Sequence, residues 1–271
     1  VTIQYSEAYN ISSGTGCDGG GFDMDGGVTN GTMQYNYSHN NDGGGFLIGQ
    51  FTGARPMENI TLRYNVSEND AATNGGSVYL FNGDNVNAMK NIFIHNNTFF
   101  LSEKSGNTSA AVVKYTYWKV LKYNINFNNN IFYASNGADL INIPAGYEAK
   151  FAGNLYYSSD NNFKIYYGGN QYNSLSSFRN ETGQEIQNNL PTGLNENPFL
   201  INAGNGGIIG FENNLSSLTA YKLQTNSPAI NSGIDVHVGT GMRDFFGNII
   251  SNNISNDIGA QDNSNDKARQ L

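Results

Sequence analysis

The chain has 271 residues with 22 acidic side chains, 14 Lys or Arg side chains and a formal net charge of -8. This balance argues against nucleic-acid binding, which needs a basic face, and the single cysteine, Cys17, excludes an internal disulfide or a multi-cysteine metal site. No apolar stretch is long enough to span a membrane. The sequence opens at Val1 directly in a strand-like segment, so we expect a processed or truncated chain whose N-terminal turns are missing.

Two kinds of short alternating segment follow one another along the chain. Asn-rich segments begin at residues 2, 32, 61, 92, 125 and 150, and short apolar segments begin at residues 22, 46, 78, 112, 140 and 163. The spacing is about 23 to 33 residues, and Gly and Asn stand between the segments. No long apolar stripe of helical period is present, so the pattern predicts an all-β protein.

A repeat of this length with several short strands predicts a solenoid in which each turn stacks on the previous one. Asparagine recurs at matching places in the repeats. In a parallel solenoid such residues lie about 4.8 Å apart, and their amides can form a hydrogen-bonded ladder. The predicted ladder consists of Asn36, Asn65, Asn97, Asn130 and Asn154.

These repeats resemble the single-stranded right-handed parallel β-helix of the pectin-lyase-like superfamily. The later segments "NPFLI" at 197, "YKLQTNSPAINSGI" at 221, "RDFFGNII" at 243 and "DIGAQD" at 257 resemble the closing part of secreted β-helix glycosidases and repeat proteins. The resemblance implies one domain over residues 1–271. Residues 1–159 would form regular turns, and residues 160–271 would form the final turns and a C-terminal cap.

The segment "CDGGGFDMDGG" at residues 17–27 is rich in carboxylates and glycines, and "DGGGF" occurs at 18–22 and again at 42–46. Aligning the turns on this motif stacks Asp18 over Asp42, and we expect Asp70 to extend the column. In the strand that follows the motif, Phe22 and Met24 should point inward.

The same alternation turns Asp23 and Asp25 outward. Tyr79 and Phe81 should occupy the same outward positions on a later turn. The cluster then combines neighbouring carboxylates with aromatic side chains, and glycines leave space around them.

The leading interpretation is a glycoside hydrolase, because that chemistry uses two carboxylates about 5 to 9.5 Å apart. The candidate catalytic residues are Asp18 and Asp25, with Asp42 in support. No cofactor is required. The candidate substrate-binding residues are Asp23, His39, Glu68, Tyr79 and Phe81.

Two other interpretations remain open. Asp18, Asp42 and Asp70 could bind calcium, either structurally or in a calcium-dependent polysaccharide lyase, because stacked carboxylates suit hard cations. Alternatively, the aspartates are ordinary turn residues. The protein would then be a non-catalytic glycosylated surface or filament protein, or a glycan-binding structural protein.

The expected partner is a polysaccharide or oligosaccharide, with a homo-oligomer or filament as a further possibility, and the expected location is extracellular, secreted or on the cell surface. Sequons for N-glycosylation would suit that location. They begin at Asn10, Asn30, Asn36, Asn59, Asn65, Asn96, Asn107, Asn180, Asn214 and Asn253.

Overall fold

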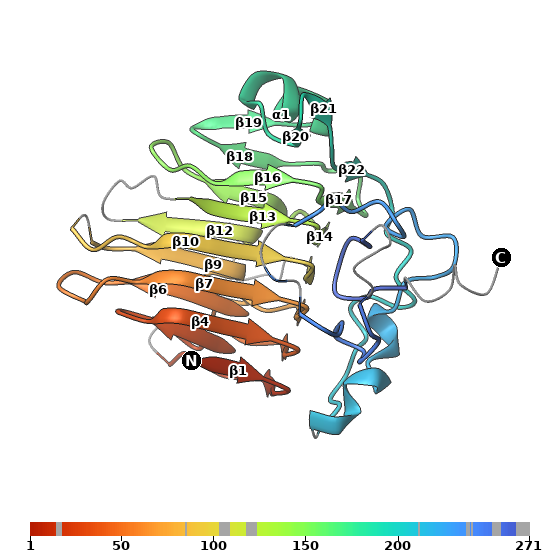
Figure 1. The fold of residues 1–271 in the computed structure, drawn as a ribbon, viewed down its shortest axis with the longest axis horizontal. Helices are drawn as coiled ribbons and strands as arrows, with labels where there is room; N and C mark the ends of the chain where they lie inside the picture. Colours follow the sequence, from red (N-terminus) through yellow and green to blue (C-terminus); the bar gives the residue numbers. More distant parts are fainter. Residues whose placement is uncertain are drawn as a thin grey trace.

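The computed structural model describes residues 1–14, 18–84, 86–102, 109–117, 124–210, 212–236, 239, 241–250 and 256–263. Three long sheets dominate it, and the chain visits them in rotation (Figure 1). Except for one antiparallel pair at the end of the third sheet, neighbouring strands in the three sheets are parallel. The all-β prediction is confirmed, and the stacked turns are compatible with a β-helix.

Sheet A contains β1 (Thr2–Gln4), β4 (Thr29–Gln34), β7 (Glu58–Arg63), β10 (Lys90–His95), β13 (Ile125–Asn128) and β16 (Lys150–Ala152). Sheet B contains β2 (Glu7–Tyr9), β5 (Tyr37–His39), β8 (Val66–Glu68), β11 (Thr98–Ser102), β14 (Ile131–Ser135), β17 (Leu155–Ser158) and β22 (Leu194–Asn195). Sheet C contains β3 (Phe22–Asp25), β6 (Phe46–Gln50), β9 (Gly76–Asn82), β12 (Ala111–Tyr117), β15 (Asp139–Ile143), β18 (Ile165–Tyr167) and β19 (Asn170–Tyr172).

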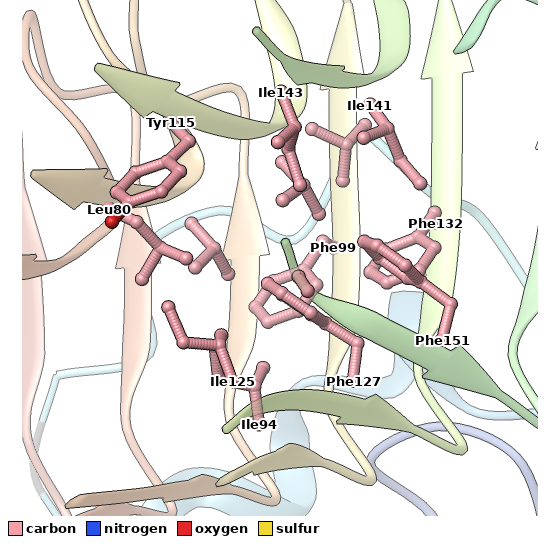
Figure 2. Packing of buried hydrophobic residues seen from close by; sticks show 14 of the residues in the cluster. Leu80, Ile94, Phe99, Tyr115, Ile125, Phe127, Phe132, Ile141, Ile143 and Phe151 are labelled. Carbon is pink, nitrogen blue, oxygen red and sulfur yellow. The ribbon is translucent and has the colours of Figure 1, made fainter. Parts of the chain in front are cut away.

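The inward side chains of all three sheets form one hydrophobic core along the stack (Figure 2). Because the strands are in register, like side chains fall above one another. Phe127 and Phe151 stack with ring centroids 4.7 Å apart, and Phe99 and Phe132 do so at 6.2 Å. The alternation of apolar and polar residues in the sequence therefore defines the inside of the stack of strands.

The predicted asparagine ladder is present. From Asn36 through Asn65, Asn97 and Asn130 to Asn154, each side-chain amide donates to the Oδ1 of the next asparagine at 3.0 Å. Backbone N–H groups of the same residues donate to the same oxygens. The ladder thus satisfies buried polar groups at the bend between sheets A and B.

The last turn is covered by α1 (Leu175–Thr182) and the antiparallel pair β20 (Ile186–Gln187) and β21 (Leu190–Pro191) (Figure 1). Ser174 caps α1 by accepting from the Ser177 N–H at 3.1 Å, and buried Phe178 packs on Phe151. Glu185 ends the asparagine ladder: its Oε1 accepts from Asn154 Nδ2 at 2.8 Å.

After β22, the described residues of 196–263 add no further strand to the three sheets. They run back beside the stack, as the blue part of Figure 1 shows, and include two short 3-10 helices, η1 (Glu212–Ser217) and η2 (Thr219–Tyr221). This segment, called the return segment below, forms a second apolar cluster with the outer face of sheet B. Strands β5, β8 and β11 carry buried side chains on both faces, so the outer face of sheet B needs a packing partner.

In the part of the chain that the structure describes, no helix combines the length and apolarity needed to cross a lipid bilayer.

Candidate functional site

Two aspartates of β3 project from the outer face of sheet C. Phe22 and Met24 of this strand are buried, whereas Asp23 and Asp25 are exposed, as the alternation predicts. Residues two apart on a strand share one face, with Cα atoms roughly 6.6 Å apart. Asp25 is oriented by its own turn, because its Oδ1 accepts from the Gly26 N–H at 2.8 Å.

The two carboxyl groups have different proton affinities. Partial desolvation, and then the negative charges of Asp25 and Asp18, raise the pKa of Asp23 to about 6. Desolvation also raises the pKa of Asp25, but the Gly26 N–H opposes this effect by stabilising the carboxylate. Desolvation therefore raises the pKa of both carboxyl groups, while the Gly26 N–H favours the ionised form of Asp25.

Aromatic side chains lie in register with these aspartates across neighbouring strands of sheet C, and each set of paired residues forms a column. Asp23 pairs with Leu47, which pairs with Tyr79; Asp25 pairs with Gly49, which pairs with Phe81. Tyr79 and Phe81 are half-buried on the same outer face. The predicted combination of outward carboxylates and aromatic rings on sheet C is therefore present.

Glycines create the space that these side chains occupy. A Cβ atom on Gly49 would lie 3.0 Å from Asp25 Oδ1, and one on Gly44 would lie 2.8 Å from Tyr79 Cβ. Either added carbon would crowd the neighbouring turn. The glycine-rich sequence thus lets Asp25 and Tyr79 lie close to the backbone of adjacent strands.

The expected column of three stacked aspartates is wrong in its third member, because Asp70 lies beside Asn41 and not beside Asp42. Asp18 is exposed, and its charge acts on Asp23 and Asp25. Asp42 is half-buried, and its Oδ2 accepts from the Ser13 N–H at 2.8 Å, which ties two turns together. The chain therefore brings Asp18, Asp23 and Asp25 together and gives Asp42 a turn-stabilising bond.

Asp70 lies in the interior instead. Its Oδ1 accepts from Asn41 Nδ2 at 2.8 Å and its Oδ2 from the Ser67 hydroxyl at 2.6 Å. It stacks on Asn41 rather than on Asp42, because the loop leading to β9 is longer than the equivalent loop leading to β6. Among the described residues, no group of three His, Cys, Asp or Glu side chains is placed to share a metal ion. Asp18, Asp42 and Asp70 are therefore not grouped around one point, as the calcium interpretation expected.

His39 and Glu68 do not line the face that carries Asp23. Both are buried on the outer side of sheet B, beneath the return segment. His39 Nε2 lies 3.0 Å from Glu7 Oε1, and its ring stacks on Tyr37 at a centroid distance of 4.3 Å. Their assignment as substrate contacts beside the acidic cluster is therefore wrong.

Glu68 anchors the return segment to sheet B. Its Oε2 accepts from the Gly206 N–H at 2.8 Å and from the Tyr221 hydroxyl at 2.6 Å. Glu7 does the same for the N–H groups of Ile209 at 2.9 Å and Gly210 at 2.7 Å. These carboxylates have a structural role that sequence spacing alone did not reveal.

Of the eight sequons that begin at described residues, three start at buried asparagines. Asn36 and Asn65 belong to the ladder, and Asn96 donates from Nδ2 to the Asp257 carbonyl at 3.1 Å. A glycan on these amides is incompatible with the folded chain. Asn10, Asn30, Asn59, Asn180 and Asn214 are exposed, whereas Asn107, Asn253 and Cys17 lie outside the described residues.

Further polar groups of sheet C were missed from the sequence. The column of Asp23 and Tyr79 continues through Lys114 and Asn142 to Tyr166. Nearby, Lys164 Nζ lies 2.8 Å from Asp139 Oδ1. These residues occupy equivalent positions in successive repeats. An alignment of the repeats that allows for loops of unequal length would have predicted this column.

Comparison with known proteins gives no family: no family model matches the chain, and no curated protein matches it.

Proposed function

We propose that the protein is an extracellular glycoside hydrolase built on a right-handed parallel β-helix of the pectin-lyase-like type. The observation that carries this proposal is the pair of outward carboxylates on β3, Asp23 and Asp25, held two residues apart. Their spacing on the strand is compatible with the 5 to 9.5 Å range that glycosidases use. Tyr79 and Phe81, in the same two columns, would supply ring faces for sugar C–H groups.

The two carboxyl groups divide the chemistry between them. Asp23, whose pKa is raised to about 6, donates a proton to the leaving glycosidic oxygen. Asp25, oriented by the Gly26 N–H, acts as the carboxylate that either activates water or attacks the sugar. Asp18 raises the proton affinity of both groups and so favours the form in which one proton is retained.

The experiment is a screen of neutral and acidic polysaccharides for release of reducing ends, with wild type beside three variants. Asp23→Asn and Asp25→Asn should each lower kcat by about 10²- to 10⁴-fold. The matched control is Glu196→Gln, an exposed carboxylate after β22, which should leave the rate unchanged.

The pH profile supplies an independent test. Because Asp23 must be protonated to act as an acid, kcat should fall as pH rises above about 6. The proposal is overturned if no polymer is cleaved by the wild type, or if Asp25→Asn remains as active as the control.

A further inference from the structure

A second feature suited to a ligand lies far from the β3 aspartates. A cavity of about 600 Å³ opens where the end of sheet A meets β18, β19 and the end of α1. It lies five strands along sheet C from β3, which corresponds to roughly 24 Å. Its volume falls within the roughly 300 to 1,000 Å³ typical of small-molecule sites.

The lining combines apolar surface with uncharged hydrogen-bonding groups. Ile125, Tyr167 and Tyr172 supply the apolar part, while Asn170 and Gln184 contribute amides. This mixture suits a molecule with hydroxyl groups around an apolar face, which is the character of a sugar ring.

The charges at the cavity are balanced. Glu148 and Lys150 line it together, and both are exposed at its rim. An acidic sugar would gain attraction from Lys150 but meet repulsion from Glu148. A neutral saccharide meets no such conflict, and both charged groups can accept or donate hydrogen bonds to its hydroxyls.

The wall of the cavity is held in place by the fold. The Tyr167 hydroxyl donates to the Ala149 carbonyl at 2.9 Å, and Gln184 Nε2 donates to the Tyr167 hydroxyl at 3.1 Å. Gln184 Oε1 in turn accepts from the Phe151 N–H at 2.8 Å. Because these bonds connect three separate elements, the polar wall is formed before a ligand arrives.

We propose that this cavity binds a short neutral oligosaccharide without cleaving it. The inference goes beyond the proposed hydrolysis, because it uses neither Asp23 nor Asp25. It would give the protein a second carbohydrate-binding site, at the opposite end of the stack from the outward aspartates.

The test is calorimetric titration of the Asp25→Asn protein with cellotriose, maltotriose, xylotriose, chitotriose and trigalacturonic acid. Using this variant keeps binding separate from cleavage, so the two proposals fail independently. At least one neutral trisaccharide should bind saturably and more tightly than trigalacturonic acid. Adding Lys150→Ala or Asn170→Ala should weaken that binding about 5- to 10-fold, as expected for one lost hydrogen bond.

Lys90→Ala is the matched control, because Lys90 begins β10 just as Lys150 begins β16 in the same sheet, and both are exposed. It should leave the affinity unchanged, and all variants should keep the wild-type unfolding midpoint. The proposal is overturned by the absence of saturable binding, by binding that Lys150→Ala and Asn170→Ala leave intact, or by a preference for trigalacturonic acid.

Discussion

The outer faces of sheets B and C arise from the same repeat, but one is covered by the chain and the other faces solvent. On sheet B, Tyr37, His39 and Glu68 are buried beneath the return segment. On sheet C, Asp23 and Asp25 of β3 face solvent, with half-buried Tyr79 and Phe81 farther along the sheet. Glu7 and Glu68 on the covered face accept N–H groups of the return segment, whereas Asp23 and Asp25 on the open face lie close to each other and to the charge of Asp18.

The difference shows that carboxylates near the turns between these parallel sheets have more than one role. Glu68 and Asp70 both have buried hydrogen-bond partners that explain them structurally. Asp23 has an exposed position and a pKa raised to about 6, and among the described residues no such partner explains its placement. Exposure and proton affinity together separate the proposed site from the scaffold.

The largest effect should come from Asp25→Asn on the open face. The substitution keeps the shape of the side chain but removes the carboxylate, so kcat should fall by about 10²- to 10⁴-fold while thermal stability stays unchanged. Parallel measurements of reducing-end release and of the unfolding midpoint test this. A stable variant with full activity would remove Asp25 from the mechanism and weaken the contrast between the two faces.

Next in size is Asn97→Ala in the buried ladder. Asn97 Oδ1 accepts from the Asn65 N–H and side-chain amide, and its own amide donates to the Leu62 carbonyl and to Asn130 Oδ1. Orphaning these groups should lower the free energy of unfolding by about 3 kcal/mol. The comparison is Asn126→Ala on the outer face of sheet A, which should change it by less than about 0.5 kcal/mol. Equal losses in urea denaturation would contradict the structural role of the ladder.

Glu68→Ala tests the covered face. It leaves the Gly206 N–H and the Tyr221 hydroxyl without their acceptor, so we expect a loss of about 2 kcal/mol in the free energy of unfolding. Activity per folded molecule should not change, because Glu68 lies beneath the return segment. If Glu68→Ala abolished turnover without altering the unfolding midpoint, the outer face of sheet B would have the catalytic role that we assign to sheet C.

A smaller effect concerns pH. Burial raises the pKa of Asp70 from 3.8 to about 7, so the folded chain binds a proton there that the unfolded chain has released. Its contribution to stability is present below about pH 4 and is lost as the pH rises through about 7. Asp70→Asn, which mimics the protonated form, should be more stable than wild type at pH 8. Its unfolding midpoint should also vary less between pH 5 and 8, and an unchanged slope would contradict this account.

Much of the fold could be predicted, because inward positions repeat with period two and the asparagines recur at one bend. Phe22 and Met24 inward, Asp23 and Asp25 outward, and the whole ladder follow from that periodicity. The position of Asp70 could not be predicted, because loops of unequal length shift the alignment between sheets B and C. The cover over His39 and Glu68 was also missed. Its signal is present in β11, where "TFFLS" is apolar on both faces of the strand and therefore requires packing on both sides.

The central claim, that the outer face of sheet C is the carbohydrate-processing surface, is tested most directly by a crystal structure. The protein would be the Asp25→Asn variant with an oligosaccharide that the wild type cleaves. We predict a sugar chain over β3, β6 and β9, with a glycosidic oxygen within hydrogen-bond distance of Asp23 and a ring against Tyr79 or Phe81. A cleavable oligosaccharide found only on another face, with the outer face of sheet C empty, would contradict it.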